Sequence, residues 1–315
     1  MKQKQLLSFL VCILMLSSCA APTDSALDSG LTLRVYFADA EEIRLLPLED
    51  YVFGALAAEM PANYAPEALK CQAVAARTRA VAQSHAFGGN GCVRHPDCDI
   101  CTDSACCQAY QTDAQLHARW GSEYVVLRAR IDRAVRATDG LLLTSGGLPI
   151  EVLYHACSGG KTEDAAKPYL VSVDSPGEEG YAGFRADTSF SCEEAADLLL
   201  RAFPGCGVTA DTLPSAIRLQ STTASGRVAT LLVGSQTVRG ADFRKALSLR
   251  STYFTWEADG DRIVFHTVGY GHGVGLSQAG AQAMAAGGAD FAEILAHYYP
   301  GTQLTRMDKT GFSGS

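Results

Sequence analysis

The hydrophobic and polar positions divide the chain into segments typical of strands and segments typical of helices. Residues 31–37 alternate apolar and polar side chains, and a second short run at 42–46 follows an acidic turn, so together they predict a hairpin. Residues 48–58 and 66–84 instead carry apolar or alanine side chains at three- and four-residue spacing. This spacing indicates two successive helices.

Beyond an irregular stretch at 87–111, helices and strands continue to alternate. The pattern predicts regular segments at 125–137 and 140–144, a strand at 149–155, a helix from Ser191, strand pairs at 217–219 with 228–233 and at 254–256 with 263–265, and helices from Gln278 and over 291–298. Helices mixed with antiparallel strands predict an α+β fold. We expect residues 31–306 to form one domain, in one lobe or two, around a substrate groove.

Glu59 is an acidic residue inside the apolar run where the first two helices meet. Pro61 disfavours helical geometry at Met60, so the first helix should end at Glu59. Apolar neighbours desolvate this carboxyl and the negative end of the helix repels its charge, and both effects raise its pKa. A raised pKa suits a general acid, although a solvated glutamate at a helix end fits the same pattern.

The second helix carries polar side chains that could face Glu59 or a ligand. They are Gln72, Arg77, Thr78 and Arg79. For each of them a solvated helix face is the alternative interpretation.

Both ends of the chain differ from the predicted domain. Lys2 and Lys4 precede an apolar stretch, 6–16, that is too short to span a bilayer, so residues 1–18 predict a secretion signal. Leu16-Ser17-Ser18-Cys19 resembles the lipobox of bacterial lipoproteins. We therefore expect a lipid anchor at Cys19 on the outer face of the cytoplasmic membrane, a tether at 19–30 and a flexible tail at 307–315.

The charge of the chain argues against nucleic acid as a partner. Removing residues 1–18 takes away two lysines and no acids, so the formal charge falls from −8 to −10. Such a surface repels polyanions in general. Any polymeric substrate is then better sought among neutral sugars.

The cysteines point to a metal site. Nine of the 11 cysteines remain once Cys12 and Cys19 are set aside, and this odd number cannot all form disulfides. The run HPDCDICTDSACC offers more donors than the four that a zinc ion takes, namely His95, Cys98, Cys101, Cys106 and Cys107. Four protein ligands would make the metal structural. A disulfide loop, such as Cys92 with Cys98, is the alternative.

Two further motifs carry candidate chemistry. His155 and Ser158 lie in HACSGG, but the surrounding sequence is not G-x-S-x-G, which argues against a serine hydrolase. The loop GYGHGVG at 269–275 opens a helix, and no lysine follows its last glycine, which argues against a nucleotide phosphate loop. With His272 and Gln278 as hydrogen-bonding groups, the loop fits a sugar polymer; a packed turn that supports Glu59 is the alternative.

EMPANYAPEALKCQAVAARTRA, GYGHGVGLSQAGAQAMA and ILAHYYPGT, with HACSGGKTE between the first two, together resemble the stage II sporulation protein D family of cell-wall proteins. The resemblance extends over roughly residues 31–306. It implies a peptidoglycan lytic transglycosylase whose catalytic glutamate falls on Glu59. It also implies work on glycan strands beside a peptidoglycan amidase, during engulfment of a forespore.

The resemblance assigns further residues by position. Tyr154, His155 and Ser158 would line the glycan groove, and a zinc ion would take His95, Cys101, Cys106 and Cys107, with Cys98 as a substitute for His95. The further candidates for substrate binding, Gln72, Arg77, Tyr270, His272 and Gln278, come from the second helix and the glycine-rich loop. Cys106 stands where the family has a second histidine. Family members commonly carry tryptophan at the position of Tyr270 and a bulky aromatic residue at that of Ala279.

Two rival functions follow from the same residues. A non-catalytic glycan-binding protein that stimulates an amidase needs the groove but no proton donor. A glycoside hydrolase would need a second carboxylate, such as Glu163 or Asp174.

Overall fold

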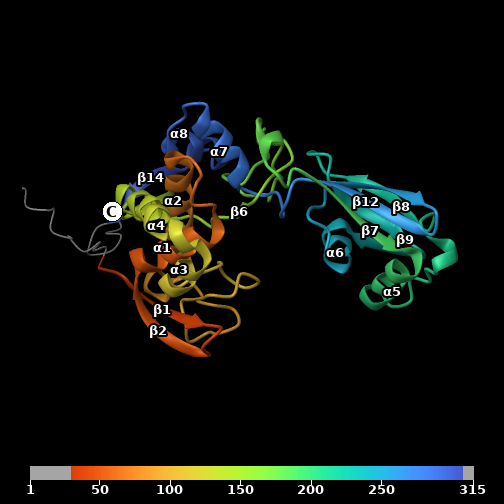
Figure 1. Cartoon of the computed structure of the whole chain (residues 1–315), viewed down its shortest axis with the longest axis horizontal. Coiled ribbons are helices and arrows are strands. Elements are labelled where there is room, and N and C mark those ends of the chain that lie inside the picture. Colours follow the sequence, from red (N-terminus) through yellow and green to blue (C-terminus); the bar gives the residue numbers. More distant parts are fainter. Residues whose placement is uncertain (1–29, 308–315) are drawn as a thin grey trace, which may run out of the picture.

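The computed structural model describes residues 30–307, which form two lobes joined by extended segments (Figure 1). One hydrophobic core takes its residues from Leu33 to Leu170 and again from Leu276 to Met307, whereas the second core takes its residues from Ala195 to Phe265. The second lobe is thus an insertion in the chain of the first. The predicted α+β class is confirmed. The predicted signal, lipid anchor and tether at residues 1–29 and the tail from 308 lie outside the described residues.

The first lobe is built around one alanine-rich helix. This helix, α2 (Pro66–Gln83), contacts α1 (Leu48–Glu59), α4 (Tyr124–Ala137), α7 (Gln278–Ala286) and α8 (Phe291–Tyr298). Alanines on several of its sides are fully buried, because their small side chains let the neighbouring helices approach closely. Helix α2 therefore fixes the positions of the segments that follow Glu59 and Gln278.

The strands of the first lobe form three small sheets. β1 (Thr32–Phe37) pairs antiparallel with β2 (Glu42–Pro47), as predicted, and parallel with β3 (Ile100–Cys101). β4 (Leu141–Ser145) lies between β5 (Leu148–Pro149) and β14 (Gln303–Arg306). β6 (Tyr154–His155) runs parallel to β13 (Leu276–Ser277), which brings the HACSGG and GYGHGVG motifs side by side.

The second lobe holds two three-stranded antiparallel sheets and two helices. Its elements are β7 (Arg185–Ser191), β11 (Phe254–Asp259) and β12 (Arg262–Val268); β8 (Ile217–Thr222), β9 (Val228–Val233) and β10 (Gln236–Arg239); and α5 (Cys192–Ala202) and α6 (Gly240–Ala246). The rings of Phe243, Phe254 and Phe265 pack together at its centre. Ser191 caps α5 in a capping box with Glu194, as its position in the sequence predicts.

Some elements differ from the sequence-based expectation. The strand expected at 149–155 is two short strands, β5 and β6, because residues 150–153 make no ladder. α3 (Asp113–Trp120) was not predicted, since it buries only Leu116, although its Thr112–Gln115 capping box is visible in the sequence. Short 3-10 turns occur at η1 (His85–Phe87), η2 (Gly121–Glu123), η3 (Glu178–Gly180) and η4 (Ala210–Thr212). Within residues 30–307 no helix is long and apolar enough to cross a bilayer.

Candidate functional site

Glu59 is the last residue of α1, as the proline two residues later predicts. Met60 is extended (φ −124°, ψ 140°), and its N–H donates to the Leu56 carbonyl at 3.1 Å. The Glu59 side chain is half-buried, and its Oε1 accepts a hydrogen bond from the Ala109 N–H at 2.7 Å. The end of the helix thus points a carboxyl toward the loop that follows the cysteine cluster.

The surroundings of Glu59 raise its pKa, in the direction that the sequence predicts. Burial is the largest influence and raises the pKa, whereas the Ala109 N–H, the Tyr154 hydroxyl and the charge of Arg79 favour the ionised form and oppose this shift. The carboxyl therefore combines a high pKa with donors ready to stabilise its anion.

Tyr154 connects Glu59 to the core. Its hydroxyl lies beside Glu59 and donates its single proton to the Gln108 Oε1 at 2.8 Å. Gln108, fully buried, in turn donates to the Tyr51 hydroxyl at 3.2 Å. Gln108 and the Ala109 N–H were missed by sequence reasoning, because a position in an irregular loop carries no periodic signal.

Among the polar residues of α2, Arg79 is the one that acts on Glu59. Its guanidinium also donates to the Cys107 carbonyl at 2.9 Å. Arg79 thereby links the catalytic candidate to the cysteine loop.

The glycine-rich loop packs directly against the HACSGG segment. Cys157 and Tyr270 exchange two backbone hydrogen bonds, of 3.0 and 2.8 Å. Gly271 has φ +116°, and a Cβ there would lie 2.6 Å from that of His155, so only glycine allows this approach. The rings of His155 and His272 lie 5.5 Å apart as a result.

The two histidines are held in their neutral forms. Burial lowers the pKa of His155 far below its usual range. The side chain of His272 is exposed on one side, yet the surrounding protein, together with Arg244, Arg79 and Arg227, lowers its pKa to about 4. The His272 Nδ1 accepts from the Val274 N–H at 3.1 Å, so at neutral pH this imidazole bridges backbone groups and carries no charge.

Three residues that sequence analysis assigned to substrate binding lie in the core, where a glycan cannot reach them. Arg77 is 0% exposed and forms an ion pair with Glu49 at 2.6 Å. Gln72 is also 0% exposed and accepts from the Gln278 Nε2 at 3.2 Å. Ser158 is 0% exposed and donates to Glu178 at 2.8 Å. These three assignments are corrected to structural roles.

Of the other residues assigned to substrate binding, Tyr154, His155 and Gln278 are largely buried beside the motif loops. Tyr270 and His272 are exposed.

Glu178 is a second carboxylate near the motifs and was not expected from the sequence. It accepts from the N–H groups of Ser158, Gly159 and Gly160 at 2.7–3.2 Å and from the hydroxyls of Ser158, Ser175 and Ser277. Burial alone would raise the pKa of Glu178, but the hydrogen bonds outweigh it and lower the pKa. Glu178 thus ties the HACSGG turn to the start of α7.

A recess of about 480 Å³ opens beside Pro61, two residues after Glu59. Its walls include Tyr64, Tyr181 and the α7 residues Ala279 and Gln282. The Gln282 side chain holds this wall in place, because its Oε1 accepts from the Ala65 N–H at 2.6 Å.

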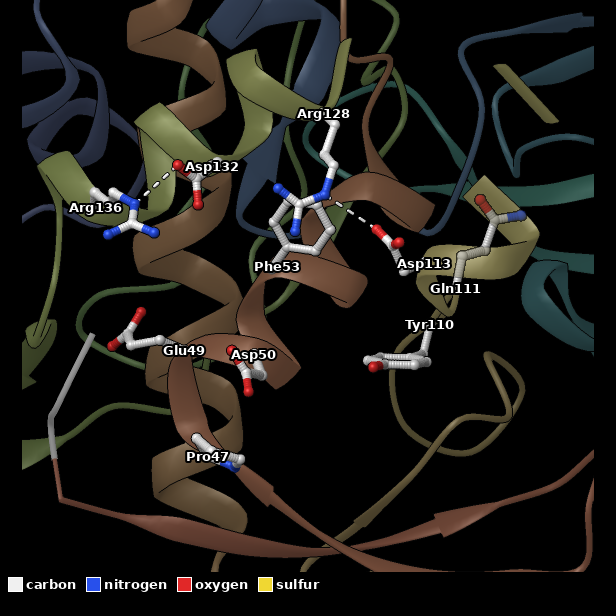
Figure 2. A pocket seen from close by; sticks show the side chains of 10 residues that line it. All are labelled: Pro47, Glu49, Asp50, Phe53, Tyr110, Gln111, Asp113, Arg128, Asp132 and Arg136. Carbon is white, nitrogen blue, oxygen red and sulfur yellow. Dashed lines mark hydrogen bonds and ion pairs between the residues drawn. The ribbon is translucent and has the colours of Figure 1, made fainter. Parts of the chain in front are cut away.

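A second cavity, of about 770 Å³, lies along α1 and α4, and Figure 2 shows its lining. Arg128 covers the ring of Phe53 there, with its guanidinium carbon 5.2 Å from the ring centroid. None of the site residues expected from the sequence lines this cavity.

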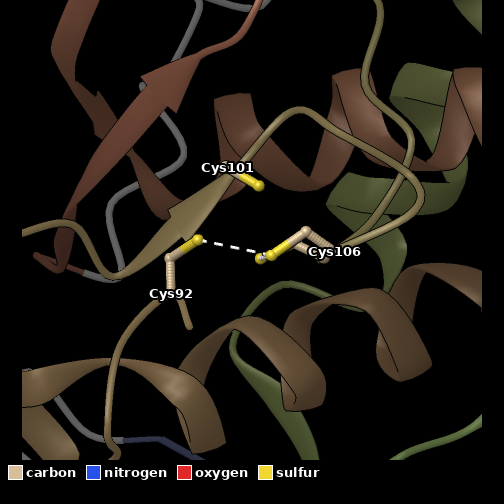
Figure 3. Close-up of side chains that lie close together, drawn as sticks. Cys92, Cys101 and Cys106 are labelled. Atoms are coloured by element: carbon tan, nitrogen blue, oxygen red, sulfur yellow. Dashed lines mark hydrogen bonds between the residues drawn. The ribbon is translucent and has the colours of Figure 1, made fainter. Parts of the chain in front are cut away.

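Four cysteines converge where β3 meets the loop that follows it. The sulfur atoms of Cys92, Cys101, Cys106 and Cys107 all lie within 4.8 Å of one another, and Figure 3 shows three of these side chains directed into one space. The Sγ atoms of Cys92 and Cys106 are 3.6 Å apart, and those of Cys106 and Cys107 are 3.9 Å apart. A zinc–sulfur bond of about 2.3 Å in a tetrahedron requires sulfur atoms roughly 3.8 Å apart. The cluster therefore fits a metal ion.

This set differs from the expected one at a single position. His95 stacks on Tyr36, with ring centroids 3.6 Å apart, and is not in the cluster, which Cys92 completes instead. Cys98, the expected substitute for His95, is not in the cluster either. Cys92 and Cys98 are both free thiols, so they do not form the alternative disulfide.

Comparison with known proteins places these features in a family. The family model described as "Stage II sporulation protein" matches residues 36–144. The chain is 36% identical over 286 residues to "Stage II sporulation protein D" of Bacillus subtilis (strain 168), an alignment that covers 89% of this chain and 80% of the relative. The chain belongs to the stage II sporulation protein D family.

Other relatives agree with this membership. The protein of the same name from Bacillus amyloliquefaciens is 36% identical over 287 residues, with 89% of this chain and 80% of the relative covered. The chain is also 27% identical over 307 residues to "Amidase enhancer" of Bacillus subtilis (strain 168), with 80% of this chain and 40% of the relative covered. The family is thus related to the cell wall both through sporulation and through a protein named for an amidase.

Proposed function

We propose that this member of the stage II sporulation protein D family is a peptidoglycan lytic transglycosylase with Glu59 as its single acid and base. The observation that carries the proposal is the half-buried Glu59 carboxyl, whose pKa is raised by burial. A general acid must hold its proton near neutral pH and release it to the substrate.

The reaction begins with proton transfer from Glu59 to the oxygen of the β-1,4 bond between N-acetylmuramic acid and N-acetylglucosamine. The C1–O bond breaks, and the leaving sugar takes the proton as a hydroxyl. The Ala109 N–H, whose nitrogen lies 2.7 Å from Oε1, stabilises the carboxylate that forms, and the Tyr154 hydroxyl would add to this by turning its proton from Gln108 to Glu59. Glu59 then removes the proton of the C6 hydroxyl, whose oxygen attacks C1 and closes the 1,6-anhydro ring.

The surroundings of Glu59 support one carboxylate rather than two. The groups with the largest influence on its pKa, apart from burial, are the Ala109 N–H, the Tyr154 hydroxyl and Arg79. The two acids considered for a hydrolase have other partners. Glu163 accepts from Thr223 and lies 3.7 Å from Arg227, and Asp174 is exposed near Lys161. An intramolecular hydroxyl removes the need for a second carboxylate.

Digestion of purified glycan strands tests the reaction. We expect products that end in 1,6-anhydro-N-acetylmuramic acid, identified by mass spectrometry, and none from Glu59→Gln. Reducing-end sugars from the wild-type protein would instead establish a hydrolase.

An alternative function is a glycan-binding protein that stimulates a peptidoglycan amidase. The similarity to a protein named amidase enhancer favours it. Under this alternative, Glu59→Gln would stimulate a purified amidase as strongly as the wild-type protein does. Under the transglycosylase proposal, stimulation falls together with strand cleavage.

The four-cysteine cluster would hold a structural zinc ion. Cys92, Cys101, Cys106 and Cys107 would be its ligands, which leaves no position for water or substrate. Zinc would only cross-link the irregular loop that carries Gln108 and Ala109 and would take no part in the reaction. The Gln83 Nε2, 3.2 Å from the Cys107 sulfur, would orient one ligand.

The cellular setting follows from the termini and the family. A lipid at Cys19 would anchor the protein to the outer face of the bacterial cytoplasmic membrane, within reach of the peptidoglycan. There it would remodel the wall during sporulation, beside an amidase that removes stem peptides.

A further inference from the structure

The turn between β8 and β9 of the second lobe contacts the first lobe. Within this turn, the Arg227 N–H donates to the Thr223 hydroxyl at 3.2 Å, and the Thr223 N–H donates to the Arg227 carbonyl at 2.8 Å. Glu163, from the segment after HACSGG, accepts from the hydroxyls of Thr223 and Ser225. The Glu163 N–H donates to the Gly273 carbonyl at 2.8 Å. Glu163 thus joins the turn to the glycine-rich loop.

Arg227 extends from this turn into the space between the two motifs. Its side chain is 1% exposed, its Nη2 donates to the Ser158 carbonyl, and its Nε lies 3.7 Å from the Glu163 carboxylate. Gly273 has φ +86°, and a Cβ there would lie 2.7 Å from the central carbon of the guanidinium. Glycine at position 273 therefore allows Arg227 to pack against both the HACSGG turn and the glycine-rich loop.

This position is unfavourable for a cation. Among the described residues, the Nε and Nη1 atoms of Arg227 are buried without a hydrogen-bond partner. Burial lowers the pKa of the guanidinium, against the charges of Glu163 and Glu178. A buried ion pair often contributes little to stability, because apolar residues of similar volume would serve as well. A cation placed in this way is more typical of a functional site than of a core.

The loop that Arg227 contacts carries His272 to the candidate active site. The His272 ring hydrogen-bonds to the backbone of Tyr154, and the charge of Arg227 acts on the ring. The Tyr154 hydroxyl lies beside Glu59. Because His272 precedes Gly273 directly, a displacement of Gly273 would move the exposed His272 relative to Glu59.

We propose that Arg227 is a positioning residue through which the second lobe holds the glycine-rich loop, and with it His272, in place for the substrate beside Glu59. This inference rests on the proposed action on glycan strands. Arg227 is enclosed by protein and acts through Ser158 and Gly273. Without its guanidinium the loop would be less ordered, and a strand would have to order it on binding. Binding would weaken, whereas proton transfer in the bound strand would change little.

Titration of variants with purified glycan strands tests this role. Each substitution is made in Glu59→Gln, which should bind strands without cleaving them. Arg227→Lys keeps the charge but loses the planar fork that spans Ser158 and Glu163. Arg262→Lys is the matched control, because the Arg262 guanidinium donates to β7 within the second lobe.

We expect Arg227→Lys to weaken strand binding about tenfold, the effect of losing a hydrogen bond from a charged group, and Arg262→Lys to leave binding unchanged. In the protein that retains Glu59, Arg227→Lys should raise KM by a similar factor and leave kcat close to the wild-type value. Unchanged binding, or a fall in kcat as large as the rise in KM, would overturn the positioning role.

Nuclear magnetic resonance of the histidine rings separates positioning from a general loss of structure. In Arg227→Lys the pKa of His272 should rise from about 4, because a less ordered loop exposes the ring to water, which favours its charged form. The ring signals of His297 on α8 should stay where they are. Weakened binding with an unchanged His272 titration would show that Arg227 does not act through the loop.

A second variant keeps the test decisive if Arg227→Lys fails to fold. Glu163→Gln changes a partly exposed side chain and removes the charge that faces Arg227. It should weaken strand binding and raise the pKa of His272 in the same directions. A folded Glu163→Gln protein with wild-type binding and a wild-type His272 titration would overturn the proposal.

These outcomes are separate from those for the proposed function. Reducing-end products from wild-type digestion would refute the transglycosylase reaction and leave the effects of Arg227→Lys on binding and on His272 intact. Unchanged binding by Arg227→Lys would remove the role of Arg227 and leave the Glu59 chemistry intact.

Discussion

Glu59 and Glu178 are two protein-enclosed carboxyls of the same lobe with opposite pKa shifts. Glu59 accepts from one backbone N–H and lies beside the Tyr154 hydroxyl, whose proton goes to Gln108, and burial prevails, so its pKa rises. Glu178 receives three N–H groups and three hydroxyls, which prevail over burial, so its pKa falls. The number of hydrogen-bond donors around such a carboxyl, and not burial alone, therefore decides whether it can act as an acid.

The largest expected effect is the loss of activity in Glu59→Gln. The amide keeps the shape but cannot give a proton, so the rate of strand cleavage should fall about 10²–10⁴-fold. The measurement is the release of anhydro-sugars over time. Glu178→Gln is the control variant, since the folded protein should still release anhydro-sugars. A Glu59→Gln protein as active as the wild type would place the proton donor elsewhere.

The second effect concerns stability. In Glu178→Gln, a carboxylate that accepts many hydrogen bonds is replaced by an amide with fewer lone pairs. The NH₂ group of this amide would also face N–H and O–H groups that are themselves donors. The free energy of unfolding should fall by about 3 kcal/mol, as expected for the loss of charged hydrogen bonds in the interior. Urea unfolding of both proteins measures the difference. A change in the free energy of unfolding below about 0.5 kcal/mol would show that the hydrogen bonds to Glu178 contribute little to stability.

Loss of a bound metal should affect Glu59 more than Glu178, because the cysteine loop leads to the Ala109 donor of Glu59 but not to Glu178. Removing a bound metal with a chelator should lower both the thermal unfolding temperature and the activity, and the two should recover together when zinc is added. Cys92→Ser should bind zinc more weakly than His95→Ala does. Loss of activity with an unchanged unfolding temperature would contradict a structural role.

The pH dependence of stability should differ between the two carboxyls. Because the pKa of Glu178 is lowered on folding, its contribution is complete above the ordinary glutamate pKa of about 4.3 and is lost as the pH falls toward its folded value. Wild-type stability should therefore drop below about pH 4.3 more steeply than that of Glu178→Gln. Parallel curves from unfolding at several pH values would contradict the lowered pKa.

The smallest expected effect is on the stability of Glu59→Gln. The raised pKa of Glu59 means that its charged form opposes folding above the ordinary pKa, so a neutral side chain should leave stability at pH 7 unchanged or raise it by up to about 1 kcal/mol. The same urea measurement serves here. A loss comparable to that of Glu178→Gln would make Glu59 a structural residue and remove the contrast.

Local signals in the sequence predicted much of the fold. Pro61 ends α1, Ser191 begins α5 and the apolar spacing of 291–298 marks α8, because each signal acts within one turn of backbone. The strands β7 and β10 and helix α6 were not predicted, since their formation depends on packing within the second lobe. The division into two lobes likewise depends on contacts between residues far apart in the chain, which the pattern of hydrophobic positions does not show.

Residues of the candidate site could be predicted only where neighbouring residues in the sequence determine the surroundings of the side chain. Glu59 could be found because a carboxyl before Met-Pro must end a helix. Arg77 was misplaced because α2 carries alanines on several sides, so its pattern does not show which side is buried. The resemblance placed a zinc ligand on His95 by its spacing, but spacing in an irregular loop does not determine which donors meet, and Cys92 occupies that place in the cluster. Glu178 acquires its role from residues up to 99 positions away.

The most direct measurement is a titration of the Glu59 carboxyl by nuclear magnetic resonance, with Glu178 observed in the same spectra and each signal assigned by its glutamine variant. We expect a pKa for Glu59 above about 4.3 and one for Glu178 below it. A Glu59 that ionises at or below that ordinary value would leave the protein without its proposed acid.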